Sequence, residues 1–206
     1  MELRGLYGMV DLPLRGGGPP GGKLARQLLD GGARILQLRM KGASAAAMLA
    51  VVDELRPLCR RHEATLIVND RLDVALAGGA HGVHLGQDDL PLAYARALAP
   101  KPFLIGVSTH TPEQARAAIA GGADYLGFGP CFATRSKENP DPIVGLAQLA
   151  AVCALGTPVV AIGGITLDRV ADVARSGASA AALIAAVNGA PDIATAARAV
   201  VAAFTR

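Results

Sequence analysis

Aromatic side chains are scarce in this sequence: they make up 3% of 206 residues, and tryptophan is absent. Binding of single-stranded nucleic acid by stacking depends on such rings, so this class of function is disfavoured. The hydrophobic fraction is nevertheless 51%, so the core must be filled by Ala, Leu, Val and Ile. That composition is typical of helices packed on a buried parallel sheet, and the length suits a single domain over 1–206.

Cysteines are also few, long apolar runs are absent, and the net charge is small. Three widely spaced cysteines form neither a disulfide framework nor a zinc ligand set, which indicates a reducing, cytoplasmic setting. There is no signal-peptide pattern at the start and no run of about 18 apolar residues to cross a membrane. The net charge is only +3, and the basic cluster Arg56, Arg60 and Arg61 has the spacing of a solvated helix face. We therefore expect small-molecule partners, with no nucleic acid and no membrane; an oligomer is compatible with the sequence but not indicated by it.

What the sequence does contain is a repeat. A Gly-Ala pair precedes a short apolar run at 32–33, 79–80, 122–123 and 177–178. Each Gly is expected to end a helix in the left-handed conformation and to lead into a strand. Further β-like runs lie at 5–10, 66–70, 103–108 and 158–164.

Eight strands alternating with about eight helices predict a compact α/β fold, the (β/α)₈ or TIM barrel. An open, doubly wound sheet is the alternative. Such a sheet should carry a GxGxxG turn after its first strand, whereas this chain has DLPLRGGGPPGG there.

Helix boundaries can be read from capping residues. Apolar spacing predicts a helix over 44–62 with an irregularity at Pro57. Thr111, followed by a proline and then Gln114, predicts the start of a second helix, and Thr166 predicts the start of a third.

Polar residues gather where the strands are expected to end, which is where barrels of this type hold their active sites. Gln37, Arg39 and Lys41 alternate along the second strand, so they should converge on one side. Two cations on an apolar strand are costly to bury without an anion, so a phosphate or diphosphate is the predicted ligand. An internal salt bridge across the strand ends is the alternative.

Carboxylates follow the third and fourth strands. Asp70 directly ends an apolar run, and Asp88 and Asp89 follow the next one. Neighbouring carboxylates of this kind suit Mg²⁺, which keeps several waters and binds substrate phosphates. Alternatively, Asp88 or Asp89 caps a helix that starts around Pro91.

The remaining strand ends carry hydroxyls and glycines. Ser108 and His110 follow the fifth strand, where loop hydrogen bonding is the simpler interpretation, and His84 within the fourth strand suits a core position. The loop over 129–137 combines small hydroxyl residues with a lysine, which favours either an anion-binding loop or a solvated charged one. Glycines near Gly164 would let backbone N–H groups approach a phosphate, although glycine is also common in tight turns.

Six motifs in order resemble thiamine phosphate synthases over essentially the whole chain: QLRMK (37–41), VNDR (68–71), GVHLGQDD (82–89), GVSTHT (106–111), GADYLGFGPCFATRSK (122–137) and AIGGIT (161–166). The resemblance implies a transferase of thiamine biosynthesis. Its substrates would be a hydroxymethylpyrimidine diphosphate and a thiazole phosphate, and its products thiamine phosphate and pyrophosphate.

The resemblance also implies residue roles. The positions matching the pyrimidine diphosphate site are Gln37, Arg39, Lys41, Asn69, Ser108 and Lys137. Of these, the catalytic roles fall to Arg39, Lys41, Ser108 and Lys137. The positions matching the Mg²⁺ ligands are Asp70 and Asp89, and those matching the thiazole phosphate site are Thr134, Ser136, Gly164, Ile184 and Ala185.

One position departs from the family pattern, because Ala185 stands where a serine is usual. If backbone N–H groups provide most of the phosphate contacts, the missing hydroxyl costs about 0.5–1.5 kcal/mol. Weaker thiazole phosphate binding is therefore expected, without loss of activity.

Three other functions are compatible with the same fold. A related thiazole tautomerase shares much of the pattern but usually lacks the second aspartate, which is present here as Asp89. A non-catalytic barrel that binds a phosphorylated metabolite would bind without releasing pyrophosphate. Isomerases or lyases of aromatic amino acid synthesis use strand-end groups that have no match in this chain.

Overall fold

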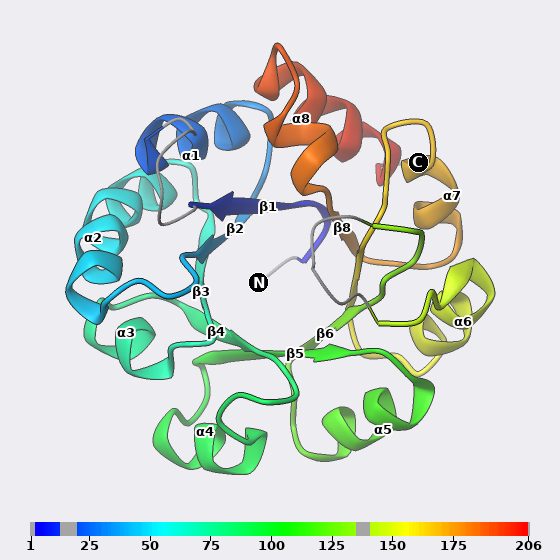
Figure 1. The fold of residues 1–206 in the computed structure, drawn as a ribbon, viewed down its shortest axis with the longest axis horizontal. Coiled ribbons are helices and arrows are strands. Elements are labelled where there is room, and N and C mark those ends of the chain that lie inside the picture. Colours follow the sequence, from blue (N-terminus) through cyan, green and yellow to red (C-terminus); the bar gives the residue numbers. More distant parts are fainter. Residues whose placement is uncertain (1–2, 13–19, 135–140, 206) are drawn as a thin grey trace.

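The computed structural model describes residues 3–12, 20–134 and 141–205, and it shows a closed barrel of parallel strands in the order β1 to β8 (Figure 1). The strands are β1 (Gly5–Asp11), β2 (Ile35–Arg39), β3 (Thr65–Asn69), β4 (Gly82–Leu85), β5 (Leu104–Thr109), β6 (Tyr125–Phe128), β7 (Val159–Ile162) and β8 (Ala180–Ala182). The α-helices that surround them are α1 (Gly21–Asp30), α2 (Ala45–Arg61), α3 (Leu72–Ala77), α4 (Leu92–Leu98), α5 (Pro112–Ala120), α6 (Gly145–Cys153), α7 (Val170–Arg175) and α8 (Ile193–Ala203). The predicted barrel is confirmed, and the open sheet is excluded because β8 pairs with β1.

The core has two layers, because alternate residues of each strand face inward and outward. The inner layer fills the barrel with residues such as Tyr7, Ile35 and Tyr125, and the outer layer packs Ala, Val and Leu side chains between strands and helices. Alanine, leucine and valine make up most of the outer layer. The scarcity of aromatic residues therefore matches the packing.

The Gly-Ala repeat works as predicted. The glycine of each of the four pairs has a positive φ between 64° and 96°: Gly32, Gly79, Gly122 and Gly177. In each case the glycine follows a helix and the next strand begins within a few residues. This left-handed conformation favours glycine, which explains the residue type at all four turns.

Two of the predicted helix starts need correction. Thr111 caps α5 as expected, since its hydroxyl accepts a hydrogen bond from Gln114 N. Thr166 does not cap α7, because residues 167–169 form a turn and the helix begins only at Val170. Neither Asp88 nor Asp89 caps α4, since Pro91 occupies that position without a side-chain bond.

The predicted helix over 44–62 is present as α2, which runs from Ala45 to Arg61 as one element with Pro57 inside it. The last apolar run, in contrast, is strand only over Ala180–Ala182 and then becomes the π-helix η1 (Ile184–Asn188). Ile184 and Ala185 therefore lie in the first turn of η1, beyond the end of β8.

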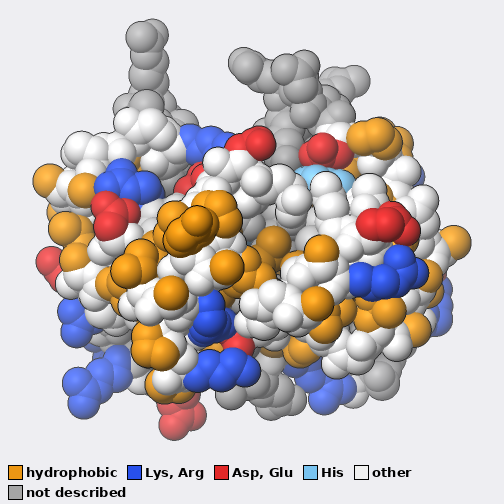
Figure 2. Space-filling view, turned by 90° about the horizontal axis from the view of Figure 1, so that it is seen from below, with side chains coloured by type: hydrophobic (Ala, Val, Ile, Leu, Met, Phe, Trp, Pro, Cys, Tyr) orange, Lys and Arg blue, Asp and Glu red, His pale blue; other side chains and the backbone are white. Residues whose placement is uncertain are grey.

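The outer surface carries some large apolar side chains. Figure 2, which faces the α4 side of the molecule, shows apolar side chains gathered on this surface. Tyr94 and Leu98 of α4, and Leu90 just before it, have exposed side chains. Among the described residues, no helix has both the length and the apolar character required to cross a membrane.

Candidate active site

The C-terminal ends of β2, β3 and β4 bring together most of the charged residues that the sequence singled out. Asp70 directly follows β3, and its backbone N–H donates to the carbonyl oxygen of His84 on β4 over 2.8 Å. Its φ is +63°, a left-handed conformation that is rare outside glycine and clusters at functional sites. Asp89 follows β4, where its Oδ2 accepts a hydrogen bond from Gly86 N over 2.6 Å.

The two carboxylates act on one another. Burial raises the pKa of Asp70 to about 6, and a hydrogen bond with Asp89 and its negative charge add to the effect. The positive charges of Lys41 and Arg39 oppose the rise in pKa. These four side chains therefore form one electrostatic cluster, which we call the carboxylate cluster: Arg39, Lys41, Asp70 and Asp89. Lys41 reaches it from the exposed turn after β2 and not from the strand itself.

We expect Asp70→Asn to stabilise the metal-free protein at pH 8 by about 1 kcal/mol, a figure reduced because the carboxyl is only partly buried. The folded-state pKa of about 6 lies above the ordinary value of 3.8, so ionising Asp70 removes stability as the pH rises through this window. The gain should therefore shrink towards pH 4. Urea unfolding in the presence of a chelator at pH 4 and pH 8 measures this gain in the free energy of unfolding, and Asp88→Asn, at an exposed position, is the control. A destabilised variant at pH 8 would contradict the argument.

Arg39 already has a partner. Its Nη1 lies 2.8 Å from Asp11 Oδ1, at the neighbouring register position on β1, and both side chains are largely buried. The salt bridge considered as the alternative for the β2 cations is thus present for Arg39. Asp11 was not predicted, although its position at the end of the first apolar run is the same signal that identified Asp70.

Gln37 and Ser108 lie in the barrel interior on β2 and β5, and each contacts a residue that the sequence analysis did not assign to the site. Gln37 Nε2 donates to Tyr7 Oη over 3.0 Å, and Ser108 Oγ lies 2.9 Å from His84 Nε2. His84 is a core residue, as predicted, and burial lowers its pKa to about 4, so its ring is neutral at pH 7. Asn69 ends β3 opposite His84.

The loop after β6 packs against the loop after β7. Cys131 N and Phe132 N donate to the carbonyl oxygens of Ile162 and Gly163 over 2.9 and 3.0 Å. A Cβ on Gly164 would lie 2.3 Å from Ala133 O, so the glycine is required by this close approach. Thr134 ends the described part of the loop, half-buried, and the predicted Ser136 and Lys137 lie outside the described residues.

His110 is a loop histidine held by two groups. Its Nδ1 lies 2.6 Å from Gly129 O, and its Nε2 lies 3.5 Å from Asp141 Oδ2. Loop hydrogen bonding, the simpler interpretation from the sequence, therefore accounts for Nδ1, and Nε2 faces the Asp141 carboxylate. Thr109 behaves in the same way, since its hydroxyl donates to Gly127 O.

The cysteines are not poised for nucleophilic chemistry. Cys59, Cys131 and Cys153 are unpaired, and burial raises the pKa of each thiol to about 11. Thiolate is the reactive form, so these side chains are inert at neutral pH.

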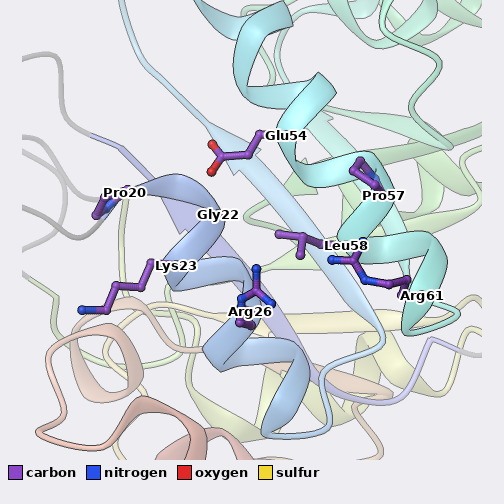
Figure 3. Close-up of a pocket in the computed structure, with 8 residues that line it drawn as sticks. All are labelled: Pro20, Gly22, Lys23, Arg26, Glu54, Pro57, Leu58 and Arg61. Carbon is purple, nitrogen blue, oxygen red and sulfur yellow. The ribbon is translucent and has the colours of Figure 1, made fainter.

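Two hollows lie outside the barrel interior. One, of about 420 Å³, lies between α1 and α2 and is lined by Lys23, Arg26, Glu54 and Arg61 among others (Figure 3). It contains none of the strand-end residues. The second, of about 370 Å³, is mainly apolar and borders Asp70 with side chains of α3 and the α4 region. The carboxylate cluster therefore has an apolar surface on one side.

Known proteins similar to this chain agree in description. The family model described as "Thiamine monophosphate synthase" matches residues 20–187. A thiamine-phosphate synthase of Anaeromyxobacter dehalogenans is 52% identical over 204 residues, covering 98% of this chain and 89% of that protein. One of Methanospirillum hungatei is 51% identical over 177 residues, covering 85% and 86%.

Solved structures give the same result for the fold. A thiamine phosphate pyrophosphorylase from Pyrococcus furiosus superposes with a TM-score of 0.89 at 36% identity, covering 99% of this chain and 96% of that one. A 3-hexulose-6-phosphate synthase superposes with a TM-score of 0.70 at 19% identity, which shows a shared barrel alone.

Proposed function

The chain belongs to the thiamine monophosphate synthase family, and we propose that the carboxylate cluster is its catalytic centre, with Mg²⁺ as the cofactor. Its activity is that of a transferase: it condenses 4-amino-2-methyl-5-hydroxymethylpyrimidine diphosphate with thiazole phosphate to give thiamine phosphate and pyrophosphate. The partners are thus small phosphorylated molecules, and the unpaired cysteines favour the cytoplasm as its location.

The proximity of Asp70 and Asp89 carries the metal assignment. Burial is the main cause of the raised pKa of Asp70, and the hydrogen bond and negative charge of Asp89 add to it; a divalent cation between the two carboxylates would offset the repulsion between them. The described residues contain no group of three or more His, Cys, Asp or Glu side chains that could hold a metal. Two carboxylates fit Mg²⁺, since it completes its coordination with water and substrate phosphate.

The mechanism requires binding, orientation and exclusion of water more than covalent chemistry by the protein. When bound, Mg²⁺ would neutralise charge on the departing diphosphate. Arg39 and Lys41 would bind the same diphosphate, with Asp11 holding the Arg39 guanidinium at the mouth of the barrel. Gln37, Asn69 and Ser108 would orient the pyrimidine diphosphate.

The remaining assignments come from the family resemblance. Lys137 would join the diphosphate site. The thiazole phosphate site would be made by Thr134, Ser136, Gly164, Ile184 and Ala185. Holding both substrates in line raises the rate without any nucleophile of the protein, which agrees with the inert thiols.

A single assay tests this proposal. With both substrates and Mg²⁺, we expect pyrophosphate and thiamine phosphate in equal amounts, with the rate falling at least about 100-fold on chelation and returning on addition of Mg²⁺. Binding without pyrophosphate release would identify a metabolite-binding barrel, and conversion of a thiazole isomer alone would identify a tautomerase. Full activity in chelator would overturn the metal assignment.

A further inference from the structure

The barrel interior contains an unbroken chain of five polar side chains from five strands. It begins at Gln37, which donates to Tyr7, and it ends at Ser108, which contacts His84. Between them, the hydroxyls of Tyr7 and Tyr125 lie 2.7 Å apart, and Tyr125 Oη lies 3.1 Å from His84 Nδ1. The two ends belong to the substrate site of the proposed function, whereas the three middle residues, Tyr7, Tyr125 and His84, have no role in it.

The direction of the hydrogen bonds follows from the Gln37 end. The amide nitrogen of Gln37 can only donate, so Tyr7 Oη accepts there. If Tyr7 then donates its hydrogen to Tyr125, the Tyr125 hydrogen is available for His84 Nδ1. A neutral imidazole that accepts on Nδ1 carries its hydrogen on Nε2 and donates it to Ser108 Oγ. The hydroxyl hydrogen of Ser108 is then left for a ligand.

The opposite direction leaves a buried donor without a partner. If Tyr125 donated to Tyr7, Tyr7 Oη would accept twice and its own hydrogen would need a third partner. The described residues provide Tyr7 with no hydrogen-bond partner beyond Gln37 and Tyr125. Tyr7 is fully enclosed in the inner core, and an unsatisfied buried hydroxyl is unfavourable. The first direction is therefore the stable one.

We propose that Tyr7 and Tyr125 are positioning residues that hold His84 as the Nε2-protonated tautomer and orient the Ser108 hydroxyl hydrogen towards an anionic oxygen of the bound pyrimidine diphosphate. The functional half of this inference rests on the proposed function; the tautomer half does not. The same series of hydrogen bonds holds the Gln37 amide with its nitrogen towards Tyr7. The side-chain carbonyl oxygen of Gln37 is therefore the atom presented to a ligand.

Two strand glycines fix the rings in place. A Cβ on Gly106 would lie 2.1 Å from Tyr125 Cζ, and one on Gly127 would lie 3.0 Å from His84 Cε1. Both rings therefore lie directly over backbone where any other residue would displace them. Tyr125 is also packed against both neighbours, with ring centroids 5.9 Å from Tyr7 and 5.5 Å from His84. This close packing restricts the movement of both rings and so keeps the geometry of the hydrogen-bonded side chains constant.

Nitrogen NMR of the ¹⁵N-labelled protein without substrates tests the tautomer directly. His84→Asn identifies the His84 signals among the four histidines. We expect a pyridine-type Nδ1 and a pyrrole-type Nε2 in the wild type, and we expect Tyr125→Phe to alter this pattern. A wild-type Nδ1-protonated ring, or a pattern unchanged by Tyr125→Phe, would overturn the proposal whether or not the protein releases pyrophosphate.

Kinetics test the consequence for substrate. We expect Tyr7→Phe and Tyr125→Phe each to raise KM for the pyrimidine diphosphate about tenfold, with kcat and the KM for thiazole phosphate changed less than about threefold. Because both hydroxyls belong to one series of hydrogen bonds, the double variant should have about the same KM for the pyrimidine diphosphate as the single variants. Tyr94→Phe, on the exposed face of α4, is the matched control and should match the wild type. Unchanged KM in both single variants, or equal losses for the two substrates, would overturn the orienting role.

Discussion

Asp89→Asn should lower kcat/KM at least about 100-fold while leaving the protein folded. The substitution removes the negative charge that the carboxylate cluster would offer to Mg²⁺, and losing such electrostatic stabilisation typically costs two to three orders of magnitude. Asn is preferable to Ala here because Asp89 Oδ2 accepts the Gly86 N–H over 2.6 Å, and an amide oxygen can keep that bond. The turn after β4 is therefore preserved, and the change reports on charge alone.

Pyrophosphate release at several Mg²⁺ concentrations measures the effect. If the metal assignment holds, the variant should need more Mg²⁺ for half-maximal rate as well as turning over more slowly. Asp88→Asn removes the same charge from the neighbouring exposed position and should stay within about twofold of the wild type. Equal losses of activity in both variants would mean that the rate depends on the overall negative charge at the mouth of the barrel and not on a metal ligand at Asp89.

The barrel could be predicted from the sequence because its signals are local. Each Gly-Ala pair marks a helix end through a single backbone conformation, and each apolar run marks a buried strand, so neither requires knowledge of distant contacts. The end of β8 could not be read in this way, since the run over 180–187 stays apolar through the change from strand to η1. The prediction of a cap at Thr166 was wrong for a similar reason: a turn intervenes before α7, and residue type alone does not reveal it.

The site was only partly predictable for a different reason. Strand-end position was sufficient to single out Asp70 and the pair Asp88 and Asp89, because barrel geometry brings neighbouring strand ends together, whereas the choice of Asp89 came from the family resemblance. The partners of Arg39 and Gln37 depend on register between strands, which the sequence does not specify. The sequence alone therefore does not distinguish Tyr7 and Tyr125 from other residues of the apolar strands. Gly106 and Gly127 within apolar strands were the available signal, since glycine in a strand interior often marks a close approach.

The glycine turn after β7 leads to the second large effect. Gly164→Ala should lower the free energy of unfolding by about 2–4 kcal/mol, because a left-handed φ and a backbone clash act together. Its φ is +65°, and a Cβ there would lie 2.3 Å from Ala133 O and 2.7 Å from Phe132 O. These are backbone atoms, so the loop after β6 must move as a whole.

Movement of that loop should also reduce activity, since Thr134 lies on it and is proposed to bind the thiazole phosphate. We expect KM for thiazole phosphate to rise more than KM for the pyrimidine diphosphate, measured under conditions where the variant is still folded. Gly156→Ala separates the two causes of instability, because Gly156 has a φ of +87° with open space around its would-be Cβ. That control should lose only about 1 kcal/mol and keep its activity. If urea unfolding gave the two variants equal losses, the close packing of the two loops would contribute little, and the glycine at 164 would be required by its backbone conformation alone.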